Sequence, residues 1–241
     1  MNMIFARESG AMKTSILRLA GEVERRLAEV LTATERRDTD ALKSWMARDS
    51  EIDDWEVRIE EECLKILALH QPVARDLRFV VAVLKINNDL ERIGDIVVNI
   101  ADRGIRLAAF PVTPLQPRLM QMGGIVREML ASSLDALMEL DVARAEAVIA
   151  RDDEVDRLNV EVIGGVIAQA TLANTGAVTE ALILTHSVAR DLERIGDHAT
   201  NIAEDVAYLV DGTIIRHQNR HRSGKTGADA APDQQENQDG Q

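Results

Sequence analysis

The chain has 241 residues, with 46% hydrophobic and 29% charged residues and a formal net charge of −13. That charge argues against a nucleic-acid partner, because phosphate binding needs clustered lysine and arginine. Aromatic residues make up only 2%, so the core must be aliphatic, which favours long helices over sandwiches and barrels. A lone Cys63, the lack of any long apolar run and an N-terminus without a signal-peptide pattern lead us to expect a soluble cytoplasmic protein.

Six helices are expected from apolar residues spaced by three and four and from the residues that start and stop helices. Asp38-Thr39-Asp40 precedes the second helix, Pro72 opens the third, and Asp141 caps the fifth. The expected ranges are 9–37, 40–69, 72–109, 115–139, 141–172 and 178–210. Because the connections are short, neighbouring helices should be antiparallel. The predicted fold class is therefore all-α, with two tandem antiparallel three-helix bundles.

The expected domain boundaries follow from composition. Phe110-Pro111-Val112-Thr113-Pro114 interrupts the helical pattern midway. The first bundle is predicted over residues 1–110 and the second over 114–212. From Arg216 onward the largest apolar side chain is alanine, so residues 213–241 are predicted to be a disordered polar tail.

An internal duplication is the strongest signal in the chain. The letters DLERIGD occupy Asp89–Asp95 and return at Asp191–Asp197, and Asn-Ile-Ala follows each copy at the same distance. A second echo, Arg-Asp-x-Glu-x-Asp, begins at Arg48 and again at Arg151. Seven consecutive identities indicate that the two halves are versions of one unit.

The duplicated segment predicts a row of oxygen ligands on one side of a helix. At about 100° per residue, Glu91 and the polar residues after it fall on one side, while Leu90, Ile93 and Ile100 face the opposite way, towards the core. The second half repeats the row, and aspartates four apart on the preceding helix are the expected partners of each. The candidate metal ligands are Glu91, Asp95, Asn99, Asp102, Asp49 and Asp53 in the first half, and Glu193, Asp197, Asn201, Glu204, Asp152 and Asp156 in the second.

Such a set of hard oxygen ligands suits Mg²⁺, Mn²⁺, Ca²⁺ or iron. The alternative is an ordinary solvated acidic face, in which Arg92 and Arg194 only neutralise the carboxylates. Gly94 and Gly196 lie within helices, where glycine costs about 1 kcal/mol, so we expect each to permit a close helix approach. His186 falls near Glu193 on the wheel, but its counterpart is Leu84, which favours a packing role.

Catalytic motifs are missing from the sequence. There is no Glu-x-x-His, so a ferritin-like di-iron centre is not encoded, and there is no P-loop, Gly-x-Ser-x-Gly or Rossmann glycine pattern. We therefore expect a protein that is not an enzyme.

The two copies of LERIGD resemble the PhoU family, the accessory and regulatory proteins of bacterial phosphate-specific transport systems. The matching letters are Leu90–Asp95 and Leu192–Asp197 with the Asn-Ile-Ala that follows each, and Gln71–Arg78 resembles the family's first-repeat signature. The resemblance covers about residues 9–210. The second half has no copy of the Gln-Pro-x-Ala-x-Asp-Leu-Arg segment, so the equivalence of the halves weakens before Val188.

The resemblance implies two three-helix bundles, often as a homodimer, with surface metal clusters for which iron, zinc, manganese and magnesium are all candidates. It also implies a negative regulator of phosphate uptake and of the phosphate-starvation response. Such a protein is an adaptor between the ATPase subunit of the phosphate ABC transporter and a membrane sensor histidine kinase. The high negative charge predicts no direct lipid binding. The alternative is a metal-dependent enzyme or metal-storage protein that uses the carboxylate clusters.

Overall fold

The computed structural model describes residues 3–48, 50–113, 115–172 and 175–212, and the predicted tail over 213–241 lies outside these ranges. The described part consists of helices joined by short turns and contains no strand. The first repeat holds α1 (Met3–Arg36), α2 (Thr39–Met46), α3 (Ser50–His70) and α4 (Ala74–Leu107). The second repeat holds α5 (Gln116–Glu139), α6 (Val142–Ala170) and α7 (Gly176–Asp211).

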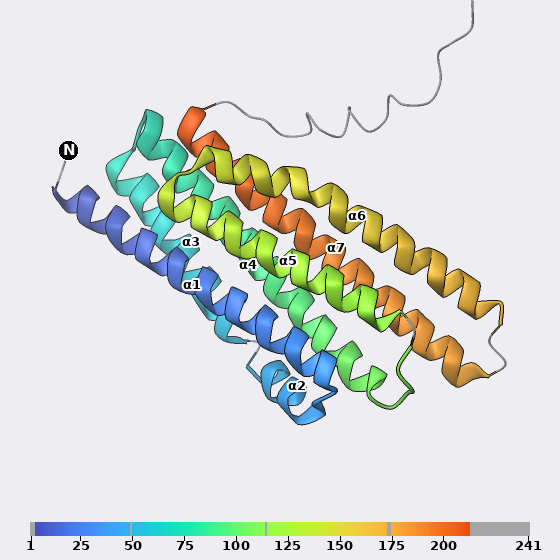
Figure 1. The fold of residues 1–241 in the computed structure, drawn as a ribbon. Coiled ribbons are helices and arrows are strands. Elements are labelled where there is room, and N and C mark those ends of the chain that lie inside the picture. Colours follow the sequence, from blue (N-terminus) through green and yellow to red (C-terminus); the bar gives the residue numbers. More distant parts are fainter. Residues whose placement is uncertain (1–2, 49, 114, 173–174, 213–241) are drawn as a thin grey trace, which may run out of the picture.

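Two bundles of long helices lie side by side (Figure 1). In the first, α1 packs on α3 and α4; in the second, α5, α6 and α7 all pack on one another. The bundles meet where α4 packs on α7 and α1 packs on α5. Leu90, Ile93 and Ile100 are fully buried, as the wheel predicted. The all-α tandem architecture is confirmed, and no helix of the described part combines the length and hydropathy needed to cross a bilayer.

Local signals in the sequence set several helix ends. The side chains of Asp38, Asp141 and Thr175 accept hydrogen bonds from backbone N–H groups in the first turns of α2, α6 and α7. Gly212, with φ of 71°, ends α7 in the left-handed conformation that glycine adopts without strain.

The N-terminal helix starts earlier than predicted, at Met3 instead of Ser9. Phe5 is buried and its ring packs edge-on against the ring of His70, with centroids 5.6 Å apart. Glu8 also accepts from Lys65 at 3.0 Å and lies 2.8 Å from Nε2 of His70. These hydrogen bonds lower the pKa of Glu8. Contacts with α3 therefore hold the extra turns of α1.

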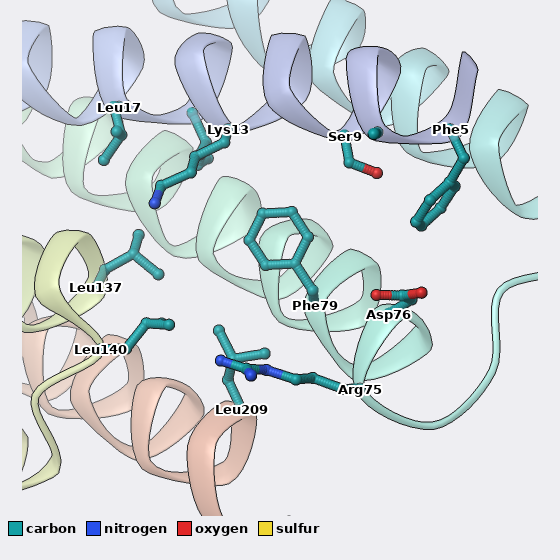
Figure 2. Close-up of a pocket in the computed structure, with 12 residues that line it drawn as sticks. Phe5, Ser9, Lys13, Leu17, Arg75, Asp76, Phe79, Leu137, Leu140 and Leu209 are labelled. Atoms are coloured by element: carbon teal, nitrogen blue, oxygen red, sulfur yellow. The ribbon is translucent and has the colours of Figure 1, made fainter. Parts of the chain in front are cut away.

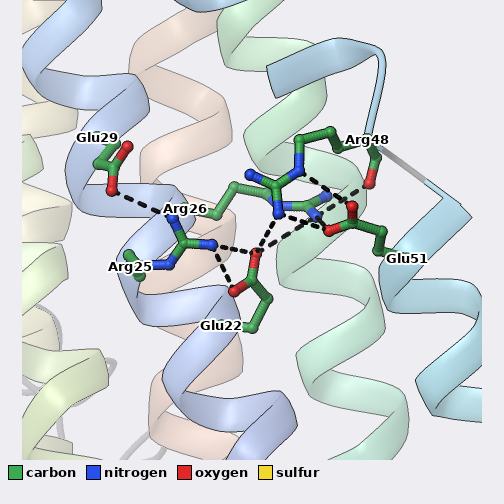
Figure 3. Close-up of polar contacts among 6 residues, drawn as sticks. All are labelled: Glu22, Arg25, Arg26, Glu29, Arg48 and Glu51. Carbon is green, nitrogen blue, oxygen red and sulfur yellow. Dashed lines mark hydrogen bonds and ion pairs between the residues drawn. The ribbon is translucent and has the colours of Figure 1, made fainter. Parts of the chain in front are cut away.

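The prediction of one helix over residues 40–69 was wrong, because the chain breaks between α2 and α3. Arg26 of α1, only 1% exposed, donates from Nη2 to the carbonyl oxygen of Arg48 at 3.0 Å. The guanidinium carbons of Arg25, Arg26 and Arg48 lie 4.9, 5.5 and 4.7 Å from the ring centre of Trp45. Figure 3 shows these arginines joined through Glu22 and Glu51. A buried cation from another helix thus stabilises the break.

Candidate functional site

A glycine lies at the contact between the carboxylate-bearing helices in each repeat, and in the first repeat it permits a close approach. A Cβ atom built on Gly94 of α4 would lie 2.8 Å from Cδ1 of Ile52 on α3. A Cβ atom built on Gly196 of α7 would lie 3.5 Å from both Val155 and Asp152 on α6. Ile52 and Val155 hold equivalent positions in the Arg-Asp-x-Glu-x-Asp echo. The predicted close approach is therefore confirmed at Gly94, whereas the distances at Gly196 are those of ordinary van der Waals contact, which a larger residue could also make.

The second acidic row joins α6 and α7. Burial and, after it, the charges of Asp197, Asp156, Asp153 and Glu193 together raise the pKa of Asp152 to about 7. Burial also raises the pKa of Glu193. The charges of Asp197 and Asp156 add to this rise, while the charges of Arg190 and Arg194 lower the pKa. The four carboxylates predicted for this row thus lie close enough to repel one another.

The first acidic row joins α3 and α4 with a somewhat different membership. Burial raises the pKa of Glu91; Asp95 adds to the rise, as do Glu56 and Asp53, while Arg92 opposes it. A charged nitrogen of Arg92 lies 3.5 Å from the carboxylate of Glu91. Sequence reasoning missed Glu56, because its counterpart in the other repeat is Asn159 and only letters shared by both halves were considered. Its spacing of three from Asp53 is the signal that places both on one side of α3.

The remaining predicted ligands lie in varied surroundings. Asn99 and Asp102 are exposed on α4, and Glu204 is half-buried on α7. Asn201 donates from Nδ2 to Oδ1 of Asp89 at 3.3 Å, so its amide nitrogen is already engaged. Asp49 lies outside the described residues.

The donor chemistry of both rows fits a hard cation. Carboxylates whose pKa values are raised by burial and by one another form a site of negative charge that the neighbouring arginines compensate only in part, and a divalent ion would relieve it. Among the described residues, no group of three or more His, Cys, Asp or Glu side chains is arranged to hold an ion. Nδ1 of His186 is buried and makes no hydrogen bond within the described part.

The first aspartate of each DLERIGD copy has a different role, which sequence reasoning did not foresee. Asp89 and Asp191 are buried, and each pairs with a residue of the other repeat. Oδ1 of Asp89 lies 2.8 Å from Nδ1 of His198, and Asp191 pairs with Arg103. Burial raises the pKa of Asp191, and Arg103 opposes this rise.

A third pair joins the repeats nearby, where Nζ of Lys85 lies 2.9 Å from Oδ1 of Asp205. On the helical wheel, Lys85 and Arg103 fall on the apolar side of α4, opposite Glu91. Charges in that position are the sequence signal that identifies this contact between α4 and α7.

Two cavities in the described part lie away from both rows. The larger, of about 260 Å³, is formed by α1, α4, α5 and α7 and is lined mainly by apolar side chains, including Phe5, Phe79 and Leu137. Figure 2 shows Lys13, Arg75 and Asp76 among the residues around it. None of the predicted ligands lines it or the smaller cavity beside Gly104 and Thr113.

Comparison with known proteins assigns the family. The model of the PhoU domain matches residues 16–104 and 119–206. A phosphate-specific transport system accessory protein PhoU homolog from Deinococcus radiodurans is 40% identical over 203 residues, which is 84% of this chain and 94% of that protein.

Two solved structures share the fold. The crystal structure of PhoU from Pseudomonas aeruginosa is 33% identical with a TM-score of 0.81, covering 87% of this chain and 100% of that one. The phosphate transport system regulatory protein PhoU from Streptococcus pneumoniae is 26% identical with a TM-score of 0.79, covering 88% and 99%. The tandem helical repeats, their duplicated acidic rows and these matches together establish that the chain belongs to the PhoU family.

Proposed function

We propose that this protein is a negative regulator of phosphate uptake and of the phosphate-starvation response, and that it acts without catalysing a reaction. Relatives with whole-length similarity are named as accessory proteins of the phosphate-specific transport system. The protein would act in the cytoplasm as an adaptor between the ATPase subunit of a phosphate ABC transporter and a membrane sensor histidine kinase. A homodimer is its proposed oligomeric state.

The observation that carries this proposal is the placement of the duplicated carboxylates. They lie along the sides of paired helices, and none lines either cavity. Enzyme sites are typically enclosed clefts with a few converging polar groups. Extended, twofold-repeated rows are better suited to binding ions and proteins than to enclosing a small substrate.

Metal binding by the rows is part of the proposal. Glu91, Asp95, Asp53 and Glu56 would hold an ion in the first repeat. In the second repeat the corresponding set is Asp152, Asp156, Glu193 and Asp197. A bound divalent cation would neutralise the clustered charge and fix α3 against α4 and α6 against α7. Arg92, Arg190 and Arg194 would limit the net charge of the occupied sites.

A deletion strain tests the regulatory function. Without this protein, phosphate-starvation genes should be expressed in phosphate-rich medium, and a plasmid copy should restore repression. A reporter fused to a starvation-induced promoter provides the measurement. Normal repression in the deletion strain would contradict the proposal.

One observation favours a metal-dependent enzyme as a second candidate. The pKa of Asp152, at about 7, lies in the range of a general acid or base. Turnover of a phosphate monoester by the purified protein in added Mn²⁺, abolished by Asp152→Asn, would support this candidate. No turnover above that of the variant would leave the regulator as the function.

A further inference from the structure

Two helices of the protein carry the same pair of solvent-exposed apolar residues. Val57 and Leu64 on α3 are 49% and 53% exposed, and Val160 and Ile167 on α6 are 68% and 61% exposed. We call Val57 and Leu64 the first outer pair, and Val160 and Ile167 the second outer pair. The members of each pair are seven residues apart, so they lie on one side of the helix, about 10 Å from each other.

The outer pairs belong to the duplicated unit. Val160 follows Val57, and Ile167 follows Leu64, by the same number of positions that separates Asp156 from Asp53. Each pair begins one turn after the aspartate of the acidic row and therefore continues that row along the helix. Single exposed apolar residues need no explanation, but matching pairs at the same register in two repeats point to a shared use.

The charges around the outer pairs identify the kind of occupant. Asp53, Asp54, Glu60 and Glu61 are exposed on the same side of α3 as the first outer pair. Asp153 and Asp156 are exposed beside the second pair, where Ile163 and Gly164 replace the two glutamates. A Cβ atom on Gly164 would meet no other atom within 4 Å, so this side of α6 is open.

The nearby cations are engaged within the protein. Lys65 pairs with Glu8, Arg157 pairs with Glu161, and Arg58 lies 5.9 Å from the ring centre of Trp55. Contact between two copies of this chain through the outer pairs would therefore bring acids against acids. A partner with lysine or arginine around an apolar groove is complementary.

The two outer pairs are related by an approximate twofold axis. Lys85 of α4 pairs with Asp205 of α7, whereas Arg103, farther along α4, pairs with Asp191, earlier in α7, so the two helices are antiparallel. Arg103 and Asp205 hold equivalent positions in the two repeats. Exchanging the repeats therefore maps the contact between α4 and α7 onto itself, and α3 onto α6.

We propose that the outer pairs are two equivalent docking contacts for a symmetric protein dimer, which presents two copies of one basic, apolar-lined groove. This inference rests on the proposed adaptor function, and it assigns the surface that the adaptor uses. One outer pair is too small for a stable interface, which covers about 800 Å² on each partner. Two linked contacts raise the affinity through effective concentration, and only a partner with matching symmetry can engage both.

The test measures binding of the full-length protein to the detergent-solubilised phosphate transporter and, separately, to the detergent-solubilised sensor kinase of the same organism. Three variants are compared with the parent: Val57→Ser with Leu64→Ser, Val160→Ser with Ile167→Ser, and all four together. The control carries Val112→Ser and Met138→Ser, which are 61% and 54% exposed and lie outside the outer pairs. Melting curves and size-exclusion chromatography accompany each binding curve.

Each paired variant should weaken binding to the same partner about 10-fold, and the fourfold variant at least about 100-fold, while the control binds as the parent does. Binding should also weaken as salt is raised. Equal binding by the fourfold variant and the parent would overturn this inference and leave the adaptor function standing. Binding of the parent to neither partner would overturn the adaptor function, and this inference with it. A parent dimer that becomes a monomer in the fourfold variant would show that the outer pairs join two copies of the chain instead.

Discussion

Nδ1 of His198 lies 2.8 Å from Oδ1 of Asp89, although the two residues belong to different repeats. His198 stands where the first repeat has Ile96, and both it and Asp89 are largely enclosed between α4 and α7. The contact is therefore a point where the duplicated halves differ in chemistry and depend on each other.

Replacing His198 with isoleucine, the residue of the first repeat, should destabilise the protein by about 1–3 kcal/mol. In this variant Asp89 keeps its hydrogen bond from Asn201 but loses its contact with His198. Part of a buried carboxylate then has no partner. Urea unfolding followed by circular dichroism gives the free energy. Arg106→Gln is the matched control, because its pair with Glu180 also joins the repeats but is half exposed; it should cost less than about 1 kcal/mol. If the two variants lost the same free energy of unfolding, burial would not explain the contribution of the His198–Asp89 contact.

Added Mn²⁺ should raise the Tm of the parent protein, because an ion that binds only the folded state stabilises it by mass action. The combined variant Asp95→Asn and Asp197→Asn should show a clearly smaller rise, since it removes one carboxylate from each row. Asp40→Asn with Asp135→Asn is the control, because both carboxylates are exposed on elements outside the rows. If the row variant and the control respond alike to Mn²⁺, the rows are only a solvated face.

Asp152 predicts a specific pH dependence of the metal-free protein. Its pKa is about 7 when folded, above the ordinary 3.8, so the folded state binds the proton more tightly. This contribution to stability is fully present below about pH 4 and is lost as the pH rises through about 7. At pH 8, Asp152→Asn should be more stable than the parent by roughly 1–2 kcal/mol after allowance for solvent screening. Unfolding with chelator at pH 5 and pH 8 tests this, and a difference between the proteins that does not change with pH would refute it.

Gly94 should not tolerate a larger side chain. Gly94→Val pushes against Ile52, whose Cδ1 lies 2.8 Å from the position of the first added carbon, and should cost about 1–3 kcal/mol through overpacking. It should also weaken the response to Mn²⁺ by separating α3 from α4. Gly164→Ala on the open side of α6 should instead stabilise the protein by up to about 1 kcal/mol. A Gly94→Val protein with parental stability would show that this close approach is dispensable.

Most of the fold follows from local pattern. Apolar residues spaced by three and four define α4 and α7, and the cap predicted at Asp141 agrees with a hydrogen bond in the structure. The break between α2 and α3 could not be predicted in this way, because it depends on Arg26, which is distant in sequence. Periodicity along one helix does not show which side chain of another helix will bind its carbonyl groups.

The candidate site, like the fold, was predicted only in part. Repetition of letters correctly brought Asp152 and Asp156 to Glu193 and Asp197. It missed Glu56, where the repeats have diverged, and it did not foresee that the amide nitrogen of Asn201 donates to Asp89. A helical wheel separates the buried side from the exposed side, but a buried side can face either its own repeat or the other one.

The buried charges between α4 and α7 also determine which halves recognise each other. Two copies of the first repeat, paired in the same way, would set Lys85 against Arg103, because Arg103 holds the position of Asp205. Two copies of the second repeat would set Asp205 against Asp191, with no cation between them. Only the pairing of a first repeat with a second repeat brings opposite charges together in both pairs. The duplicated chain therefore encodes the identity of its own complementary half, and unlike halves from broken or exchanged chains should associate with each other in preference to their own kind.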